Sequence, residues 1–430
     1  MIRRAVTALF TIFLRVFFRR IEVVGLERVP ATAPVVFAVN HPNGLVDPLF
    51  LLCFAPRPVS FLAKAPLFRY PIIGQLARAM ESIPVYRKQD NTSGSHAETF
   101  ARSREILGRG GSIAIFPEGT THSDPQLREL KTGAARIALG ANLQTLYVQP
   151  AGIYYTAKAK FRSAALVVFG DPLPVTPTAA DSDGEPPRDA VDTLTARIDD
   201  ALDAVTLQAD SHAALELIGF AEDLLTARHK QPLSEELVAR RRFVEGYHYL
   251  REHDPDRLER LESKTRQLAA ELGRAGIAAH SIVPRFDATT LFRVVVLLPI
   301  AILGAIPHYP AYLLIRLIAR VMAKGENELM ATMKVLAGMA LYPLTWIAIT
   351  WFMGARYGAP YAIASLVVVP FLGWIALRVL EDFDDIRGRA RALWHRAFRS
   401  HGYEQLVQQR DELRREFMAV ADEMGIRGER

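Results

Sequence analysis

The sequence Ala38-Val39-Asn40-His41-Pro42-Asn43-Gly44-Leu45-Val46-Asp47-Pro48 links an apolar run to a polar turn. The apolar run, Val35–Val39, is mostly β-branched, which predicts a buried strand. The residues Pro42-Asn43-Gly44 predict a sharp turn at the end of that strand. His41 precedes the turn and Asp47 follows it, so the two side chains can meet. The sequence therefore places an imidazole and a carboxylate together at the exit of a buried strand.

A carboxylate beside a histidine fixes the imidazole tautomer and stabilises the protonated ring. A ring held in this way is a competent general base, so His41 and Asp47 are the candidate catalytic pair. An ordinary alternative stays open on these residues alone. A histidine near a turn is often only a hydrogen-bonded surface group, and Asp before Pro commonly starts a helix.

A second stretch, Ile113-Ala114-Ile115-Phe116-Pro117-Glu118-Gly119-Thr120, repeats this design. A buried strand again runs into a turn, and one charged residue, Glu118, lies at its exit. Strand and helix patterns alternate from Ile21 to Pro174, which predicts an α/β domain with a parallel or mixed sheet. The predicted strands are Val35–Val39, Val59–Leu62, Ile83–Tyr86, Ser112–Ile115, Tyr147–Tyr155 and Ala165–Phe169, and the predicted helices include Pro48–Phe54, Ser95–Leu107 and Leu130–Leu139.

Together these stretches resemble the glycerolipid acyltransferase superfamily, whose members acylate glycerol 3-phosphate and lysophosphatidate. His41 and Asp47 resemble the family's first motif, and Phe116–Gly119 matches its third motif without change. The family's usual spacing is one residue shorter than the five residues that separate His41 from Asp47 here. This longer form resembles the glycerol-3-phosphate and dihydroxyacetone-phosphate acyltransferases. The resemblance covers roughly the first 175 residues.

The resemblance implies a set of acceptor-binding residues. Arg87 matches the arginine that ends the family's second motif and contacts the acceptor phosphate, although Glu81 and Pro84 replace the usual Gly and Phe of that motif. The alternative for Arg87 is an ordinary surface arginine. The other candidate substrate-binding residues are Lys64, Glu118, Gly119 and Thr120.

Acyl transfer from a thioester to a hydroxyl needs a base, stabilisation of the oxyanion and cations for the acceptor phosphate. The thioester is already activated, so no covalent intermediate is needed. The sequence contains no Gly-x-Ser-x-Gly, no His-Glu-x-x-His and no paired-cysteine pattern, so we expect neither a serine hydrolase nor a metal site. No cofactor is implied, and acyl-CoA or acyl-carrier protein would serve as co-substrate.

Composition indicates which partners to expect. The chain has 430 residues, a net charge of +6 and 50% hydrophobic residues, which allows several domains or a membrane protein. No run of basic and aromatic residues resembles a nucleic-acid platform. We therefore assign the positive charge to an anionic membrane surface and a phosphorylated substrate. The single cysteine, Cys53, lies in an apolar run and predicts a buried thiol.

Four further segments flank the predicted acyltransferase domain, which covers residues 21–178. Residues 1–20 predict an amphipathic membrane-anchor helix, the alternative being a helix packed on the protein. Residues 180–188 form a polar, Pro-containing linker. Residues 189–285 predict a charged helical insert that carries no evident chemistry. Residues 381–430 predict a charged helical tail.

A membrane region is predicted over residues 290–380. The runs Leu297–Ile306 and Ala311–Ile318 are apolar but short, and Pro307-His308-Tyr309-Pro310 separates them. This pattern predicts a re-entrant hairpin or a buried pair rather than two spans.

A transmembrane helical hairpin is predicted over residues 335–377. The runs Val335–Met353 and Ala359–Leu377 are uncharged and approach the roughly 20 residues that cross a bilayer. The short Gly354–Gly358 joins them, although a buried soluble hairpin is the alternative. Basic residues flank the outer ends, which predicts an integral membrane protein with its catalytic domain in the cytoplasm. They are Lys324, Lys334, Arg378, Arg387, Arg389 and Arg391.

The sequence thus predicts a membrane-bound O-acyltransferase that acts on glycerol 3-phosphate in phospholipid biosynthesis. Lysophosphatidate is the alternative acceptor. A non-catalytic lipid-binding scaffold on the same fold is the alternative from another class. The joint presence of His41, Asp47, Arg87 and Glu118 favours the enzyme, because a scaffold has no physical need for all of them.

Overall fold

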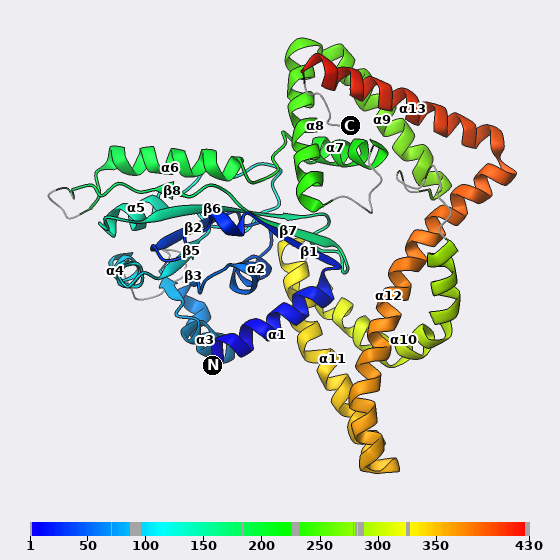
Figure 1. Ribbon diagram of the computed structural model, residues 1–430, viewed down its shortest axis with the longest axis horizontal. Coiled ribbons are helices and arrows are strands. Elements are labelled where there is room, and N and C mark those ends of the chain that lie inside the picture. The colour runs from blue at the N-terminus through cyan, green and yellow to red at the C-terminus, as the bar shows by residue number, and fades with distance from the viewer. Residues whose placement is uncertain are drawn as a thin grey trace. The chain divides into compact units, whose positions relative to one another are not determined.

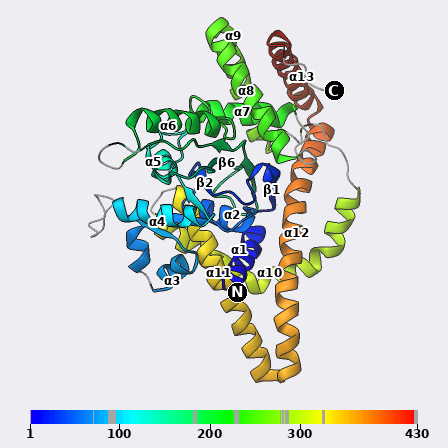
Figure 2. The same cartoon turned by 60° about the vertical axis from the view of Figure 1, so that its left-hand side comes forward.

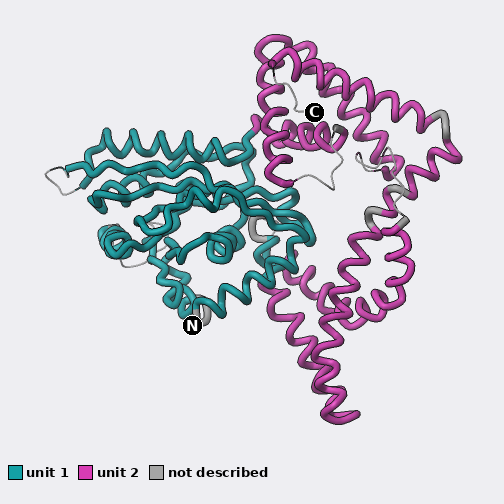
Figure 3. The backbone as a smooth tube through the Cα atoms, in the orientation of Figure 1, with its two compact units in different colours: residues 1–208, 322–335 teal, residues 209–321, 336–430 magenta. Residues whose placement is uncertain are grey.

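The computed structural model of this chain describes residues 2–69, 71–86, 96–179, 181, 185–225, 232–277, 279, 282, 288–323 and 327–425. Its contacts divide the chain into two compact units, which Figure 3 shows in separate colours. Unit 1 comprises Met1–Gln208 and Met322–Val335. Unit 2 comprises Ala209–Val321 and Leu336–Arg430. Two stretches distant in sequence therefore make up each unit.

A mixed sheet forms the centre of unit 1. Within the described residues it has eight strands in the order β1-β7-β6-β2-β5-β3-β4, and β8 also pairs with β6. Neighbours are parallel except where β6 meets β7 and β8. The strands are β1 (Arg20–Val24), β2 (Val35–Val39), β3 (Ser60–Lys64), β4 (Ile83–Val85), β5 (Ser112–Ile115), β6 (Tyr147–Tyr155), β7 (Ala164–Phe169) and β8 (Leu173–Pro174). The α/β fold with a mixed sheet is confirmed, and β1 and β8 were not predicted.

Helices cover both faces of this sheet, as Figures 1 and 2 show. On one face α4, α5 and α6 bury apolar side chains against alternate residues of β2, such as Val36 and Ala38. On the other face Phe18 packs on Phe50 of α2, with ring centroids 5.3 Å apart. The helices of unit 1 that precede residue 208 are α1 (Ile2–Phe17), α2 (Val46–Phe54), α3 (Pro71–Ala79), α4 (His96–Gly108), α5 (Gly133–Gly140) and α6 (Arg188–Asp203), with short 3₁₀ segments η1 (Leu26–Arg28) and η2 (Ala65–Arg69).

Helix α6 belongs to unit 1, although the sequence places it at the start of the helical insert 189–285. Its side chains Val191, Leu194, Ile198 and Leu202 are buried at helical spacing in the same core as α5 and the sheet. The α/β unit therefore extends past the linker, and the remaining insert helices lie in unit 2.

Helix α1 packs one side on unit 1. Its Phe10, Leu14 and Phe17 are buried, whereas Leu9 and Ile12 are exposed. Part of the apolar stripe thus contributes to the core. The exposed part is what remains to contact a bilayer, so membrane anchoring by this helix stays a prediction.

Unit 2 contains a helical bundle built from α7 (His212–Leu225), α8 (Leu233–His253), α9 (Pro255–Ala275) and α13 (Ser400–Glu423). Its core includes Leu261 and Leu268 from α9 and Leu413 from α13. Asp254 caps α9 by accepting a hydrogen bond of 3.0 Å from the amide of Arg257.

Three helices in the described part of the chain are long and apolar enough to cross a membrane: α10 (Ala288–Ala323), α11 (Asn327–Tyr357) and α12 (Ala359–Phe398). The predicted break at Pro307–Pro310 is wrong, because α10 is continuous and contains Pro299, Pro307 and Pro310. In apolar surroundings a continued helix keeps its other backbone groups bonded, and proline removes only its own donor.

Contacts between these helices lie inside unit 2. The indole Nε1 of Trp346 in α11 donates to Nε2 of His308 in α10 at 2.9 Å, and Nδ1 of His308 bonds the carbonyl of Gly304 at 2.7 Å. Helices α11 and α12 meet at Gly358, whose φ of 96° favours glycine. Crossing of a bilayer by these helices remains a prediction.

Candidate active site

The turn between β2 and α2 brings the predicted catalytic pair together. Nδ1 of His41 lies 2.8 Å from Oδ2 of Asp47. The Asp47 side chain is fully buried, whereas 16% of the His41 side chain is exposed. Strand β2 is buried along its whole length, which fixes where the turn begins. The pair therefore has a buried carboxylate and a ring that reaches solvent.

The buried Asp47 carboxylate is held by other donors as well. The amide of Asn43 donates to Oδ2 at 2.7 Å, and the hydroxyl of Tyr155 donates to Oδ1 at 2.6 Å. Such donors stabilise a carboxylate in its charged form. Burial, together with the negative charge of Asp47, raises the pKa of Tyr155 well above its ordinary value, so the phenol stays protonated as a donor.

These contacts bear on the tautomer of His41. The charged carboxylate accepts from Nδ1, so that nitrogen carries the ring proton and Nε2 keeps its lone pair. No residue in the described part of the chain hydrogen-bonds Nε2. The ring also stacks on Phe116, with centroids 4.0 Å apart and planes inclined by 20°. The site can therefore remove a proton from a hydroxyl placed beside Nε2.

Glu118, in the turn after β5, bonds the His41 turn that follows β2. Its Oε1 accepts a hydrogen bond of 2.8 Å from the amide of His41, and its Oε2 accepts one of 3.2 Å from the amide of Arg128. Oε2 also bonds Nε2 of His122, whose Nδ1 accepts from the amide of Asp124 at 3.1 Å. Glu118 is only 3% exposed. Acceptor binding by Glu118 stays a prediction, while its observed partners are protein groups.

Two further contacts tie the His41 turn to β6 and to the residues after it. Asn40 exchanges two hydrogen bonds with Ile153, of 2.7 and 3.1 Å, and so extends the pairing of β2 with β6. Nζ of Lys158 donates to the carbonyl of Pro42 at 2.9 Å and to Oγ of Ser123 at 2.6 Å. Lys158 therefore places a positive charge next to both turns.

The first turns of α11 also contact unit 1 near the His41 turn. Residues 322–335 are accordingly part of unit 1. Oγ1 of Thr332 accepts a hydrogen bond of 3.1 Å from the amide of Leu45, and Thr332 is 3% exposed. Nζ of Lys334 donates to the carbonyl of Ala159 at 2.6 Å. Neither contact was predicted, since nothing local in the sequence connects Thr332 with Leu45 or Lys334 with Ala159.

Other predicted site residues take different positions. Gly119 has a φ of +72°, which favours glycine, and a Cβ there would lie 2.6 Å from Nζ of Lys131. Lys131 thus covers this turn. Thr120 and Lys64 are exposed, with Lys64 ending β3. Arg87 lies outside the described residues.

Comparison with known proteins gives matches to both halves of the chain. Residues 20–154 match the protein-family model described as Acyltransferase, and residues 221–427 match the one described as Glycerol-3-phosphate acyltransferase 2 C-terminal domain. Glycerol-3-phosphate O-acyltransferase 2 of Saccharomyces cerevisiae is 28% identical over 332 residues, which cover 70% of this chain and 44% of that protein. Glycerol-3-phosphate O-acyltransferase 1 of the same yeast is 26% identical over 452 residues, covering 79% of this chain and 59% of that protein.

Two further matches cover a smaller part of this chain. The chloroplastic 1-acyl-sn-glycerol-3-phosphate acyltransferase of Arabidopsis thaliana is 32% identical over 122 residues, covering 28% of this chain and 33% of that protein. The solved 1-acyl-sn-glycerophosphate acyltransferase of Thermotoga maritima has a TM-score of 0.35 and 19% identity, covering 47% of this chain and 80% of that one. The chain spans about half the length of the yeast relatives that it matches.

Proposed function

Because this chain belongs to the glycerolipid acyltransferase superfamily, we propose that it transfers a fatty acyl group from a thioester donor to a hydroxyl of glycerol 3-phosphate. The observation that carries this function is the pairing of His41 with Asp47 at 2.8 Å. The pairing leaves Nε2 of His41 as a base at the carboxyl end of β2, where ligands of such sheets bind.

The transfer proceeds by direct attack. Nε2 of His41 accepts the proton of the acceptor hydroxyl while its oxygen attacks the thioester carbonyl. The tetrahedral oxyanion then collapses, the carbon–sulfur bond breaks and the ester forms. The leaving thiolate takes the proton from the imidazolium, which restores the neutral ring. Asp47 stabilises that imidazolium between the two proton transfers.

Cations near the two turns would hold the acceptor phosphate. Lys131 lies against Gly119, and Lys158 bonds the carbonyl of Pro42. Arg87 and Lys64 remain predicted contributors to the same clamp. Positive charge beside the two turns favours the binding of a phosphorylated acceptor over that of a neutral alcohol.

Lysophosphatidate is the second candidate acceptor. The relative from Arabidopsis thaliana supports it, because its printed name is that of a 1-acylglycerol-3-phosphate acyltransferase. The longer matches, over 70% and 79% of this chain, are to proteins named glycerol-3-phosphate acyltransferases, which is why that acceptor ranks first.

We further propose that the protein is integral to a membrane, with its active site on the cytoplasmic side. Three apolar helices among the described residues support insertion, and basic residues flanking the hairpin support the orientation. Extraction with alkaline carbonate tests insertion, since a peripheral protein would be released. Protease access to the α/β unit in sealed vesicles of known orientation tests the side.

The function is tested with purified protein in detergent and palmitoyl-CoA, offering labelled glycerol 3-phosphate and lysophosphatidate separately. We expect product from glycerol 3-phosphate, and no product from His41→Ala protein. Product from lysophosphatidate alone would reassign the acceptor. Lipid binding without transfer to either acceptor, with acyl-CoA or acyl-carrier protein as donor, would instead favour the scaffold.

A further inference from the structure

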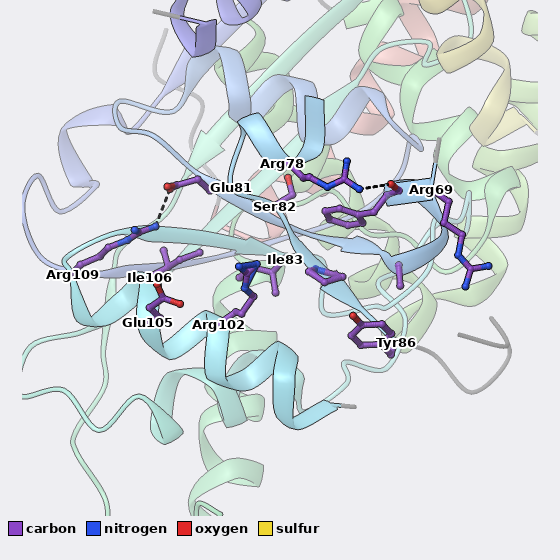
Figure 4. A pocket seen from close by; sticks show the side chains of 13 residues that line it. Arg69, Arg78, Glu81, Ser82, Ile83, Tyr86, Arg102, Glu105, Ile106 and Arg109 are labelled. Carbon is purple, nitrogen blue, oxygen red and sulfur yellow. Dashed lines mark hydrogen bonds and ion pairs between the residues drawn. The ribbon is translucent and has the colours of Figure 1, made fainter. Parts of the chain in front are cut away.

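A pocket of about 750 Å³ lies beside β4, the edge strand of the sheet. Its walls come from β4, η2, α3 and α4, all within unit 1 (Figure 4). The volume falls in the range of roughly 300–1,000 Å³ that small-molecule sites occupy. None of the catalytic residues lines this pocket, so it is separate from the His41 turn.

Positive charge dominates its lining. In the described part of the chain four arginines and two carboxylates line it: Arg69, Arg78, Arg102, Arg109, Glu81 and Glu105. Arg109 pairs with Glu81 at 3.0 Å, and Arg78 donates to the carbonyl of Phe68 at 2.9 Å. Arg69 and Arg102 form no ion pair with another described residue. Guanidinium groups on the walls of a concave site are well suited to bind phosphates.

Aromatic and apolar groups accompany these cations. Phe68, Ile83 and Ile106 contribute apolar surface, and Tyr86 lies just after β4. Figure 4 shows Tyr86 at one end of the pocket and the Arg109–Glu81 pair at the other. Arginines combined with aromatic rings favour a ligand that carries both phosphates and a flat base.

The distance from the pocket to the catalytic turn indicates which of the two substrates the pocket can bind. Strands β5 and β3 separate β2 from β4, so the pocket's strand lies about 14 Å from that of His41, at about 4.8 Å per strand. Glycerol 3-phosphate with its hydroxyl beside His41 is too short to place its phosphate inside this pocket, so that phosphate is left to the cations proposed above. A donor with a long flexible pantetheine arm can reach both positions.

Building on the acyltransferase function proposed above, we propose that this pocket binds the nucleotide head of an acyl-CoA donor. The arginines hold the diphosphate and the 3′-phosphate, and the pantetheine arm crosses the carboxyl ends of β4 and β3 toward His41. A concave pocket of this size fits a nucleotide, whereas an acyl-carrier protein would need an open basic surface. The donor is therefore a coenzyme A thioester.

Binding is measured directly by titrating coenzyme A and 3′-dephospho-coenzyme A into His41→Ala protein, which cannot turn over. We expect Arg102→Gln or Arg69→Gln to raise the dissociation constant for coenzyme A about tenfold or more. At least one of the two should also reduce the preference for coenzyme A over its dephospho form. Arg104→Gln is the matched control, because Arg104 is exposed on the same helix as Arg102 but does not line the pocket.

The possible results separate this site from the function as a whole. Coenzyme A binding that depends on Arg102 or Arg69 supports the site even if no acceptor is acylated. Acyl transfer with an unchanged KM for palmitoyl-CoA in both variants overturns it while the function stands. Effects of the same variants only on acyl-carrier protein, or only on phosphatidylglycerol vesicles, also overturn it and assign the arginines to those partners.

Discussion

The hydroxyl of Tyr155 donates its hydrogen bond to Oδ1 of Asp47, the oxygen that His41 does not use. The two oxygens therefore have different partners: Oδ2 bonds the ring of His41, and Oδ1 bonds Tyr155 at the end of β6. Because Asp47 is fully buried, each donor strongly affects the energy of its charged form. The matched Acyltransferase segment ends just before Tyr155, so this contact extends the site beyond it.

Replacing Tyr155 by Phe removes that donor and leaves the ring. A hydrogen bond to a charged group contributes about 1.5–3 kcal/mol, so we expect kcat to fall about 10- to 100-fold. Steady-state rates with glycerol 3-phosphate and palmitoyl-CoA measure the loss. Tyr147→Phe, on the same strand, is the control and should stay near wild type. Equal rates for the two variants would contradict the anchoring role.

Stability at high pH gives a second test of Tyr155. Burial and the Asp47 charge raise the pKa of this phenol in the folded protein, whereas the unfolded chain releases the proton near the ordinary value of about 10. The folded state then binds more protons, so its stability falls as pH rises above about 10. Thermal unfolding midpoints from pH 8 to 11 should therefore drop more steeply in wild type than in Tyr155→Phe. Parallel curves would contradict the raised pKa.

Replacing Asp47 by Asn tests the tautomer of His41. The amide nitrogen of Asn can donate to Nδ1, which would move the ring proton to Nε2 and remove the base. We expect kcat to fall about 10⁴-fold, the scale seen when a histidine base loses its carboxylate. Circular dichroism and the unfolding midpoint check that the protein still folds. Activity within tenfold of wild type would show that another group is the base.

Glu118→Gln separates a positioning role from acceptor binding. The Gln amide would direct hydrogens at the amide of His41 or at the donors on Oε2, so the His41 turn should shift. We expect kcat to fall about 10- to 100-fold with little change in KM for the acceptor. Glu129→Gln is the control, since Glu129 is exposed nearby. A raised KM with unchanged kcat would instead support acceptor binding by Glu118.

Thr332→Val tests the contribution of α11. Valine keeps the shape of threonine but cannot accept the hydrogen bond from Leu45, so the amide of Leu45 loses that acceptor. We expect kcat to fall about three- to tenfold. The control is Thr345→Val on the same helix, because the Thr345 hydroxyl bonds only the carbonyl of Leu341 in its own helix among the described residues. A comparable loss in both variants would indicate a general effect on α11.

The central strands could be predicted because strands that are buried on both faces leave mostly apolar runs in the sequence. Strands β2, β5 and β6 have the predicted bounds. Strand β1 was missed because all five of its residues are only partly buried and its sequence includes Arg20 and Glu22, so it shows no apolar run. The prolines of α10 suggested a break that the helix does not have.

The contacts of the candidate site likewise divide into those that local sequence could predict and those that it could not. His41 and Asp47 lie on one turn, so local sequence was enough to pair them. Tyr155 lies 108 residues beyond Asp47, and Thr332 lies 287 residues beyond Leu45, so only the fold connects these pairs. The expectation of a parallel sheet was the available signal for Tyr155. Strands β2 and β6 are parallel, so their carboxyl ends, which carry His41 and Tyr155, lie at the same edge of the sheet.

The inclusion of residues 322–335 in the α/β unit affects how the protein can be shortened. A version ending at residue 208 would keep the whole sheet, the catalytic pair and Glu118, yet it would lose the acceptor that Thr332 offers to Leu45. Such a fragment would lack the three described helices that are long enough to cross a membrane, and we expect its turnover to be lower. A synthetic peptide covering residues 322–335, added in trans, would be the way to restore it.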